Sequence, residues 1–294
     1  MDPYGMFGTP RINGFNALKP AAGARIRYAK PYYADRLRAT TVIAGNSRPE
    51  AGLDPQSACW PAAREPVFNA AVPGARLALQ IAYAEHAMAT GEVTQVLLGL
   101  DFMDFLVEPR ASPKAPAAHQ FSHVNLRVGT SGMDNPGYAR RRAAEWFQAL
   151  ASLATLSDAV QTVLRQGEDH VTTRRADGFN PGRDYVAIVR REGQAVLFRQ
   201  KNRELVTRLR RRDDAIFQDG VQWSSVFDTL ERFLDRARAQ NVDVTLFINP
   251  YHVDYFTAIR ETDRWPQLDA WKMTLSRIAR RQRVPLWDFN VINA

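Results

Sequence analysis

The amino-acid sequence predicts an α/β protein of three layers, in which helices cover both faces of a mostly parallel sheet of five strands. Short apolar runs with β-branched residues alternate with segments whose apolar residues recur every three or four positions. Several of these runs end in small or polar residues, as strands do at the carboxyl edge of a parallel sheet. One long stretch, 105–222, interrupts the alternation. We interpret it as a largely helical insertion between the third and fourth strands of a single domain, 1–294.

The first half of the predicted sheet follows an N-terminal arm. Residues 1–38 are rich in Pro, Gly and Asn and show no sustained period, which predicts an extended arm over the core. A strand, a helix and a strand at the observed spacing imply right-handed parallel crossovers. The elements expected here are strands at about 40–44, 67–72 and 93–100, with a helix over 75–90.

The spacing of apolar residues also predicts the helices and strands of the insertion and of the second half of the chain. Residues 140–164 predict one amphipathic helix, and residues 185–212 are ambiguous between a hairpin and a helix, with a helix favoured for their second half. We expect the apolar side chains of the first helix to face inward: Trp146, Phe147, Leu150, Leu153 and Leu156. Beyond the insertion we expect helices over 224–240 and 265–283 and strands over 243–248 and 284–289.

Composition limits the classes of function. Lys and Arg outnumber Asp and Glu by 39 to 31, and the excess is mostly clustered arginine, which could bind nucleic acid, anionic glycans or lipid headgroups. Such clusters are more often solvated helix faces, and no nucleic-acid-binding motif accompanies them, so we do not expect nucleic acid as a partner. Cys59 is the only cysteine, which excludes a disulfide framework, and we expect it to be buried. No run of about 18 apolar residues is present, so no membrane span is expected.

The turn after the first predicted strand is the leading candidate for chemistry. The apolar run Thr41–Ala44 ends at Gly45-Asn46-Ser47-Arg48. A serine on a tight turn at the carboxyl edge of a sheet can expose its hydroxyl while backbone amides point at the same place, which nucleophilic acyl chemistry needs. The alternative is an ordinary Gly-Asn-Ser turn, because these residues favour turns for local reasons.

Other strand ends should lie on the same edge of the sheet. Pro73-Gly74, Gly99-Leu100-Asp101 and Asn249-Pro250-Tyr251-His252 each follow a predicted strand. We expect Ser47 as the nucleophile, the amides of Ser47 and Gly74 as the oxyanion hole, and His252 as the candidate base. The alternative for His252 is that it caps a helix or lines a cleft. Arg48, beside Ser47, is a candidate clamp for an anionic group.

These blocks resemble the SGNH, or GDSL-like, hydrolase superfamily, and in particular a bacterial branch linked to cell-envelope and exopolysaccharide functions. The matching segments are Gly45–Arg48 with Gly52-Leu53-Asp54-Pro55, Phe68–Ala75, Gly99–Phe102, Asn249–His252, Trp271-Lys272 and Trp287-Asp288-Phe289. The resemblance implies a three-layer α/β/α, flavodoxin-like fold. It further implies a serine esterase or O-acetyltransferase that acts on a carbohydrate, with an acyl donor as a second ligand and with no cofactor or metal. Asn46, Arg48, Gly74 and Asp101 are then the oxyanion and substrate-binding residues.

Two departures from that pattern keep a second hypothesis open. The superfamily has Asn at the position of Asp101, where a carboxylate would repel a developing oxyanion. The relatives also have an Asp-x-x-His after the last strand, and they usually begin with a membrane anchor. We expect both features to be absent from the sequence as written, which starts at Met1 and ends at Ala294. The expected location is the periplasm or cell envelope if an anchor is missing, and the cytoplasm otherwise. The alternative is an inactive SGNH-like protein that binds glycan or serves in envelope polysaccharide assembly.

Overall fold

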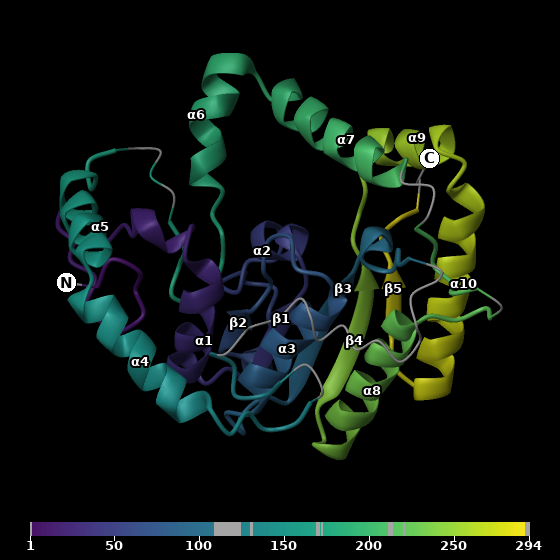
Figure 1. Ribbon diagram of the computed structural model, residues 1–294, viewed down its shortest axis with the longest axis horizontal. Coiled ribbons are helices and arrows are strands. Elements are labelled where there is room, and N and C mark those ends of the chain that lie inside the picture. The colour runs from purple at the N-terminus through teal and green to yellow at the C-terminus, as the bar shows by residue number, and fades with distance from the viewer. Residues whose placement is uncertain are drawn as a thin grey trace.

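The computed structural model describes residues 2–108, 125–129, 132–168, 171, 173–210, 214–219 and 221–291. Its centre is a five-stranded sheet, with all strands parallel, in the order β2-β1-β3-β4-β5 (Figure 1). The strands are β1 (Thr41–Ala44), β2 (Val67–Asn69), β3 (Gln95–Leu100), β4 (Asp243–Ile248) and β5 (Leu286–Asp288). The predicted α/β class, the five parallel strands and the helical region between β3 and β4 are therefore confirmed.

Helices account for most of the remaining residues that the structure describes. The longer ones are α1 (Ile26–Leu37), α3 (Leu77–Met88), α4 (Tyr138–Ala151), α5 (Leu153–Leu164), α6 (Arg183–Glu192), α7 (Ala195–Leu209), α8 (Ser225–Ala239), α9 (Val253–Glu261) and α10 (Trp265–Gln282). The shorter ones are α2 (Ser47–Gly52) and the 3-10 helices η1 (Pro20–Ala22), η2 (Ala62–Arg64) and η3 (Phe102–Asp104). Within these described elements, no helix combines the length and the apolar character needed to cross a membrane.

The main core lies on one face of the sheet. Alternate residues of the central strands, such as Val42, Val96 and Leu246, are fully buried and belong to the same cluster as the apolar residues of α1, α3, α8 and α10. The other face carries Gly99 and Phe247, and Pro49 of α2 packs against both Gly45 and Gly99. A Cβ atom on Gly99 would come within 2.7 Å of the Pro49 ring, so only glycine lets α2 lie this close to the sheet.

Three expectations about local structure were wrong. The expected extended arm includes helix α1, whose helical pattern is obscured by an internal proline, Pro31, and by the buried Lys30. Residues 140–164 form two helices, because Ser152 leaves the helical conformation and its hydroxyl caps α5 through the amide of Thr155. Cys59 is exposed, since it lies in the loop between α2 and β2.

The apolar side chains of α4 and α5 that were expected to face inward and that the structure describes are exposed instead, while the side chain of Leu150 lies outside the described part. Phe147, Leu153 and Leu156 are 77%, 86% and 63% exposed. Thr155 and Thr162 are instead the buried residues of α5. Periodicity identified the apolar face of the helix, but the direction of that face depends on tertiary contacts that the pattern does not contain.

The helices of the insertion extend from the edge of the molecule across the carboxyl edge of the sheet (Figure 1). Helices α4 and α5 lie beside the N-terminus, and α6 leads to α7, which lies next to α9. The ambiguous stretch 185–212 is helical in both halves, as α6 and α7, with a break at Gly193. The insertion therefore contributes residues to both ends of the carboxyl edge.

Candidate functional site around Ser47

Ser47 occupies the turn between β1 and α2. The strand ends at Ala44, and Asn46 caps α2 by accepting a hydrogen bond from the amide of Arg48 at 3.0 Å. Ser47 is the first residue of the helix and is exposed. Neither its hydroxyl nor its amide has a hydrogen-bond partner among the described residues. This amide belongs to the first turn of a helix, where the N–H groups have no acceptor within the helix itself.

Gly74 lies next to this turn. The chain after β2 continues to pair with the end of β1, because the amide of Val72 donates to the carbonyl of Gly45 at 2.9 Å. Gly74 follows with φ +66°, a left-handed conformation that glycine adopts without strain. Its amide also has no acceptor in the described part of the chain. The two amides expected to form an oxyanion hole are thus on adjacent segments, and neither donates to an acceptor among the described residues.

A pocket of about 380 Å³ opens beside Ser47. It lies between α1, the turn after β2 and the start of α6. The walls formed by α1 and α6 therefore come from elements outside the segments that resemble the SGNH superfamily. The side chains that give it its chemical character are Arg27, Tyr28, Ser47, Arg174, Asn180 and Tyr185. Tyr28 and Tyr185 are 50% and 43% exposed. The pocket therefore offers a hydroxyl, aromatic surface and positive charge to a ligand.

The floor of this pocket contains a buried charge cluster that the sequence did not reveal. Glu50 is fully buried and forms ion pairs at 3.2 Å with both Lys30 of α1 and Arg174 of the insertion. Burial lowers the pKa of Lys30 to about 8, and the neighbouring Glu50 opposes this shift. Because Lys30 and Arg174 lie far from Glu50 in the chain and carry no motif, only the folded arrangement brings the three together.

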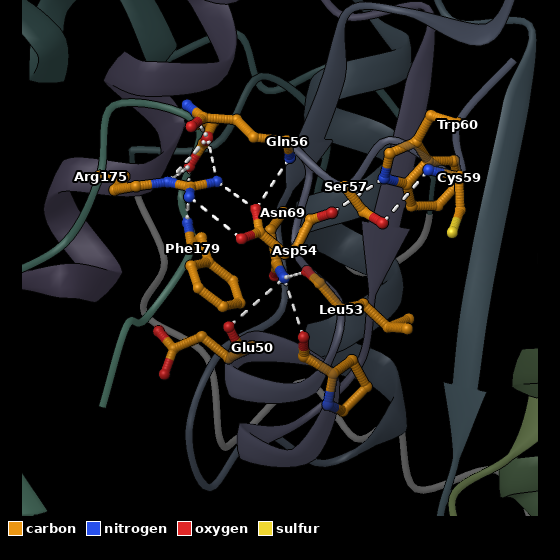
Figure 2. A network of polar contacts seen from close by, with 12 residues as sticks. Glu50, Leu53, Asp54, Gln56, Ser57, Cys59, Trp60, Asn69, Arg175 and Phe179 are labelled. Carbon is orange, nitrogen blue, oxygen red and sulfur yellow. Dashed lines mark hydrogen bonds and ion pairs between the residues drawn. The ribbon is translucent and has the colours of Figure 1, made fainter. Parts of the chain in front are cut away.

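The loop after α2 is fixed to the insertion by a second polar network (Figure 2). Arg175 pairs with both Asp54 and Asp177, and Gln56 donates to Asp177 at 3.0 Å. The side-chain amide of Asn69 donates to the carbonyls of Pro49 at 2.8 Å and Leu53 at 3.0 Å. Figure 2 shows Arg175, Gln56, Asp54 and Asn69 close together. The contacts of the Gly-Leu-Asp-Pro segment and of Asn69 therefore hold α2 in place.

Asp101 and Arg48 lie in a separate network on the other side of the turn. The Asp101 carboxylate forms an ion pair with Arg48 and accepts hydrogen bonds from the side chain of Asn46 at 3.0 Å and from the hydroxyls of Tyr251 and Tyr255, each at 3.2 Å. None of these five residues lines the Ser47 pocket. Asn46, Arg48 and Asp101, which we expected to bind substrate, therefore make their observed contacts with one another.

His252 is also placed away from Ser47. It caps α9, its ring stacks on Phe198 of α7 at 4.7 Å, and its Nδ1 accepts a hydrogen bond from the amide of Asp254 at 3.3 Å. Strand β3 and its terminal Asp101 separate the end of β1 from the end of β4. Figure 1 likewise shows α2 and α9 well apart. The described structure thus matches the alternative for His252, a helix cap, and brings no histidine to the Ser47 hydroxyl.

Two further ionisable groups are buried near the sheet. Burial lowers the pKa of His86 to about 4, although the nearby Asp35 carboxylate acts to raise it. Nε2 of the ring lies 3.1 Å from the carbonyl oxygen of Pro31, and Nδ1 accepts a hydrogen bond from the amide of Arg127 at 3.0 Å. Burial, together with the nearby Asp101 carboxylate, raises the pKa of Asp104 to about 8. Neither residue lines the Ser47 pocket.

Comparison with protein-family models, with curated proteins and with solved structures finds no match to this chain. Within the ranges that the structure describes, no group of three His, Cys, Asp or Glu side chains is arranged to hold a metal ion.

Proposed function

We propose that the protein is a serine esterase or O-acetyltransferase that acts on a carbohydrate in the Ser47 pocket. One observation carries this proposal. At one edge of the sheet, the structure places an exposed serine beside two backbone amides, those of Ser47 and Gly74, that donate to no described residue. In the reaction, Oγ of Ser47 attacks an ester carbonyl, and the sugar alcohol leaves with the serine proton. The acyl group then passes to water or to another sugar hydroxyl. The two amides are available to stabilise the negatively charged oxygen of each tetrahedral intermediate.

The walls of the pocket support a carbohydrate. Tyr28 and Tyr185 present aromatic faces with polar tips, which suits a ring that is apolar on its faces and polar at its rim. Arg27 adds an exposed guanidinium whose only observed hydrogen bond, at 3.3 Å, is to the carbonyl of Pro73. Arg174 is buried, and its guanidinium already contacts the Glu50 carboxylate and the carbonyl of Thr173. Among the described residues that line the pocket, Arg27 is therefore the exposed cation that an acidic group on the ligand can reach.

A second candidate, glycan binding without turnover, is favoured by the position of His252. A serine hydroxyl needs a general base within about 2.6–3.2 Å, directly or through one water. In the described residues the Ser47 hydroxyl has no such partner, because His252 stacks on Phe198 instead. Under this alternative, Ser47 contributes a hydrogen bond to the ligand and the pocket serves recognition alone.

Labelling with a fluorophosphonate probe tests the catalytic proposal. We expect labelling of the wild type and none of Ser47→Ala, with Ser157→Ala as the matched control, because Ser157 is an exposed serine on α5 and lies outside the pocket. Since Ser47 Oγ makes no hydrogen bond in the described structure, Ser47→Ala should keep the stability of the wild type.

Absence of labelling in the wild type would contradict the catalytic proposal. Glycan binding without turnover would then remain as the candidate function. That alternative predicts that Arg27→Ala weakens binding to a polysaccharide containing uronic acids, by about tenfold or more if one charge-assisted contact is lost. Equal affinity of the wild type and Arg27→Ala would count against the role of Arg27. No measurable binding by the wild type would count against the second candidate itself.

A further inference from the structure

Helix α5 has its polar side toward the protein and its apolar side toward solvent. Its large apolar residues, which are spaced three or four apart and so share one face, are Leu153 (86% exposed), Leu156 (63%), Val160 (50%) and Leu164 (71%). The inward side carries Thr155 and Thr162, which are buried, and Asp158, which accepts a hydrogen bond from Tyr4 at 2.6 Å. A helix of a globular protein normally has the reverse arrangement. The outward leucines therefore form a surface suited to a partner.

Helix α4, which directly precedes α5, also carries large apolar side chains at the surface. Phe147 is 77% exposed, and Trp146 is 48% exposed while one edge of its ring contacts Phe7 at 5.0 Å. The two helices follow one another across Ser152 at the edge of the molecule, beside the N-terminus (Figure 1). We call the set Trp146, Phe147, Leu153, Leu156, Val160 and Leu164 the α4–α5 apolar face. Side chains of this size seldom remain together in solvent without a binding role.

Two exposed arginines lie on α4 beside the α4–α5 apolar face. Arg140 and Arg141 are exposed, and neither forms an ion pair with a described residue. Arg140 lies seven residues before Phe147, on the same side of α4. The acidic side chains of these helices lie toward the protein, where Glu145 accepts a hydrogen bond from Tyr32 at 3.2 Å and Asp158 accepts one from Tyr4. A partner that covers this face therefore meets leucines, aromatic rings and uncompensated arginines.

We propose that the α4–α5 apolar face binds the surface of a lipid bilayer that contains anionic headgroups. Helices that lie in the membrane interface combine Leu, Phe and Trp on one face with flanking Arg or Lys, and their binding adds apolar burial to attraction by anionic lipids. A second copy of the chain fits less well. A symmetric pairing of this face would bring like charges together, and each chain carries a net charge of +8. The inference is independent of the chemistry at Ser47.

The test is co-sedimentation of the full chain with two kinds of vesicle, one of phosphatidylcholine alone and one of phosphatidylcholine mixed with phosphatidylglycerol. We expect binding to the mixed vesicles, weaker binding to the neutral ones, and release from the mixed vesicles as salt is raised. Leu156→Glu should lower the partition onto mixed vesicles about tenfold or more. The substitution removes a leucine that would be buried in the bilayer, and it adds a negative charge that anionic headgroups repel.

Met273→Glu is the matched control. Met273 is 62% exposed on α10, against 63% for Leu156, so both variants replace an equally exposed apolar residue of a helix with the same charge. Circular dichroism should show both variants folded. Equal binding losses in the two variants, equal binding to both kinds of vesicle, or no binding to either would overturn the proposal. So would a concentration-dependent dimer of the wild type that Leu156→Glu converts to a monomer, since the face would then pair with a second copy.

Discussion

Arg48 at the start of α2 and Asp101 at the end of β3 form an ion pair that joins two strand ends of the sheet. The guanidinium lies over the rings of Tyr251 and Tyr255, at 4.9 Å and 5.0 Å from their centres. Burial and the Asp101 charge keep the pKa of both tyrosines well above the usual value, so both hydroxyls remain donors to that carboxylate. Asp101 is 2% exposed, so this arrangement compensates a buried negative charge.

Asp101→Asn should destabilise the protein. The variant leaves Arg48 without its counter-ion and weakens two hydrogen bonds from tyrosine, at a cost of about 2–3 kcal/mol after allowing for the partial exposure of Arg48. Urea denaturation of Asp101→Asn, Arg48→Met and the double variant measures this as a coupling energy. Additive effects of the two substitutions would contradict the pairing. Because Asp101 lies outside the Ser47 pocket, the Asn variant should not label more strongly with a fluorophosphonate probe.

Asn69→Asp should lower the free energy of unfolding by more than the small change in side-chain shape suggests. The side-chain amide of Asn69 is fully buried and donates to the carbonyls of Pro49 and Leu53, while its oxygen accepts from the amide of Ala71 at 3.1 Å. A carboxylate cannot donate, and it adds a buried charge, so we expect a loss of about 3 kcal/mol or more in the free energy of unfolding. Thermal denaturation provides the measurement, and an unchanged Tm would show that Asn69 does not hold the α2 loop.

Gly99→Ala should destabilise the protein by overpacking. The new Cβ would lie 2.7 Å from the Pro49 ring and 2.8 Å from the Phe247 ring, so one of them must move, at a cost of about 1–3 kcal/mol. Gly52→Ala is the control, because a Cβ there meets nothing within 4 Å. Denaturant titration should give a lower midpoint for Gly99→Ala alone. Similar midpoints for the two variants would mean that α2 packs less closely on the sheet than we describe.

His86 should make the protein less stable as the pH falls from about 6.5 to about 4. In this window the unfolded chain binds a proton at His86, whose pKa is then near 6.5, while the folded chain, with a pKa of about 4, does not. The free energy of unfolding therefore decreases with falling pH, by about 3 kcal/mol across the window. His86→Gln can still accept from the Arg127 amide and donate to the Pro31 carbonyl, but it does not titrate.

Unfolding measured at several pH values in both proteins isolates this contribution. Asp104 acts in the opposite direction, because its raised pKa keeps a proton on the folded state below about pH 8, but it is present in both proteins and cancels in the difference. The wild type should therefore lose more stability on acidification than His86→Gln. Parallel pH profiles would contradict a buried neutral His86.

The sequence was informative where local chemistry decides the structure. Strand β1 and the turn to Ser47 could be predicted because an apolar run stops at glycine and Asn46 is a preferred helix cap. The partners of Asp101 and Glu50 could not, since Arg48, Tyr251, Lys30 and Arg174 reach them only through tertiary contacts. The pocket walls Tyr28 and Tyr185 were missed for the same reason. The predicted direction of the apolar face of α5 was wrong because the hydrogen bond that Asp158 accepts from Tyr4 is invisible to a count of apolar positions.

The sheet places β3 beside β4, although all of the insertion separates them in the chain. During synthesis, β1, β2 and β3 leave the ribosome well before β4, and they can pair with one another at once. Until residue 248 has emerged, β3 remains an edge strand with one row of backbone groups unpaired. The nascent chain therefore passes through a stage in which β3 can pair with other chains. That exposure lasts for as long as the insertion takes to be made.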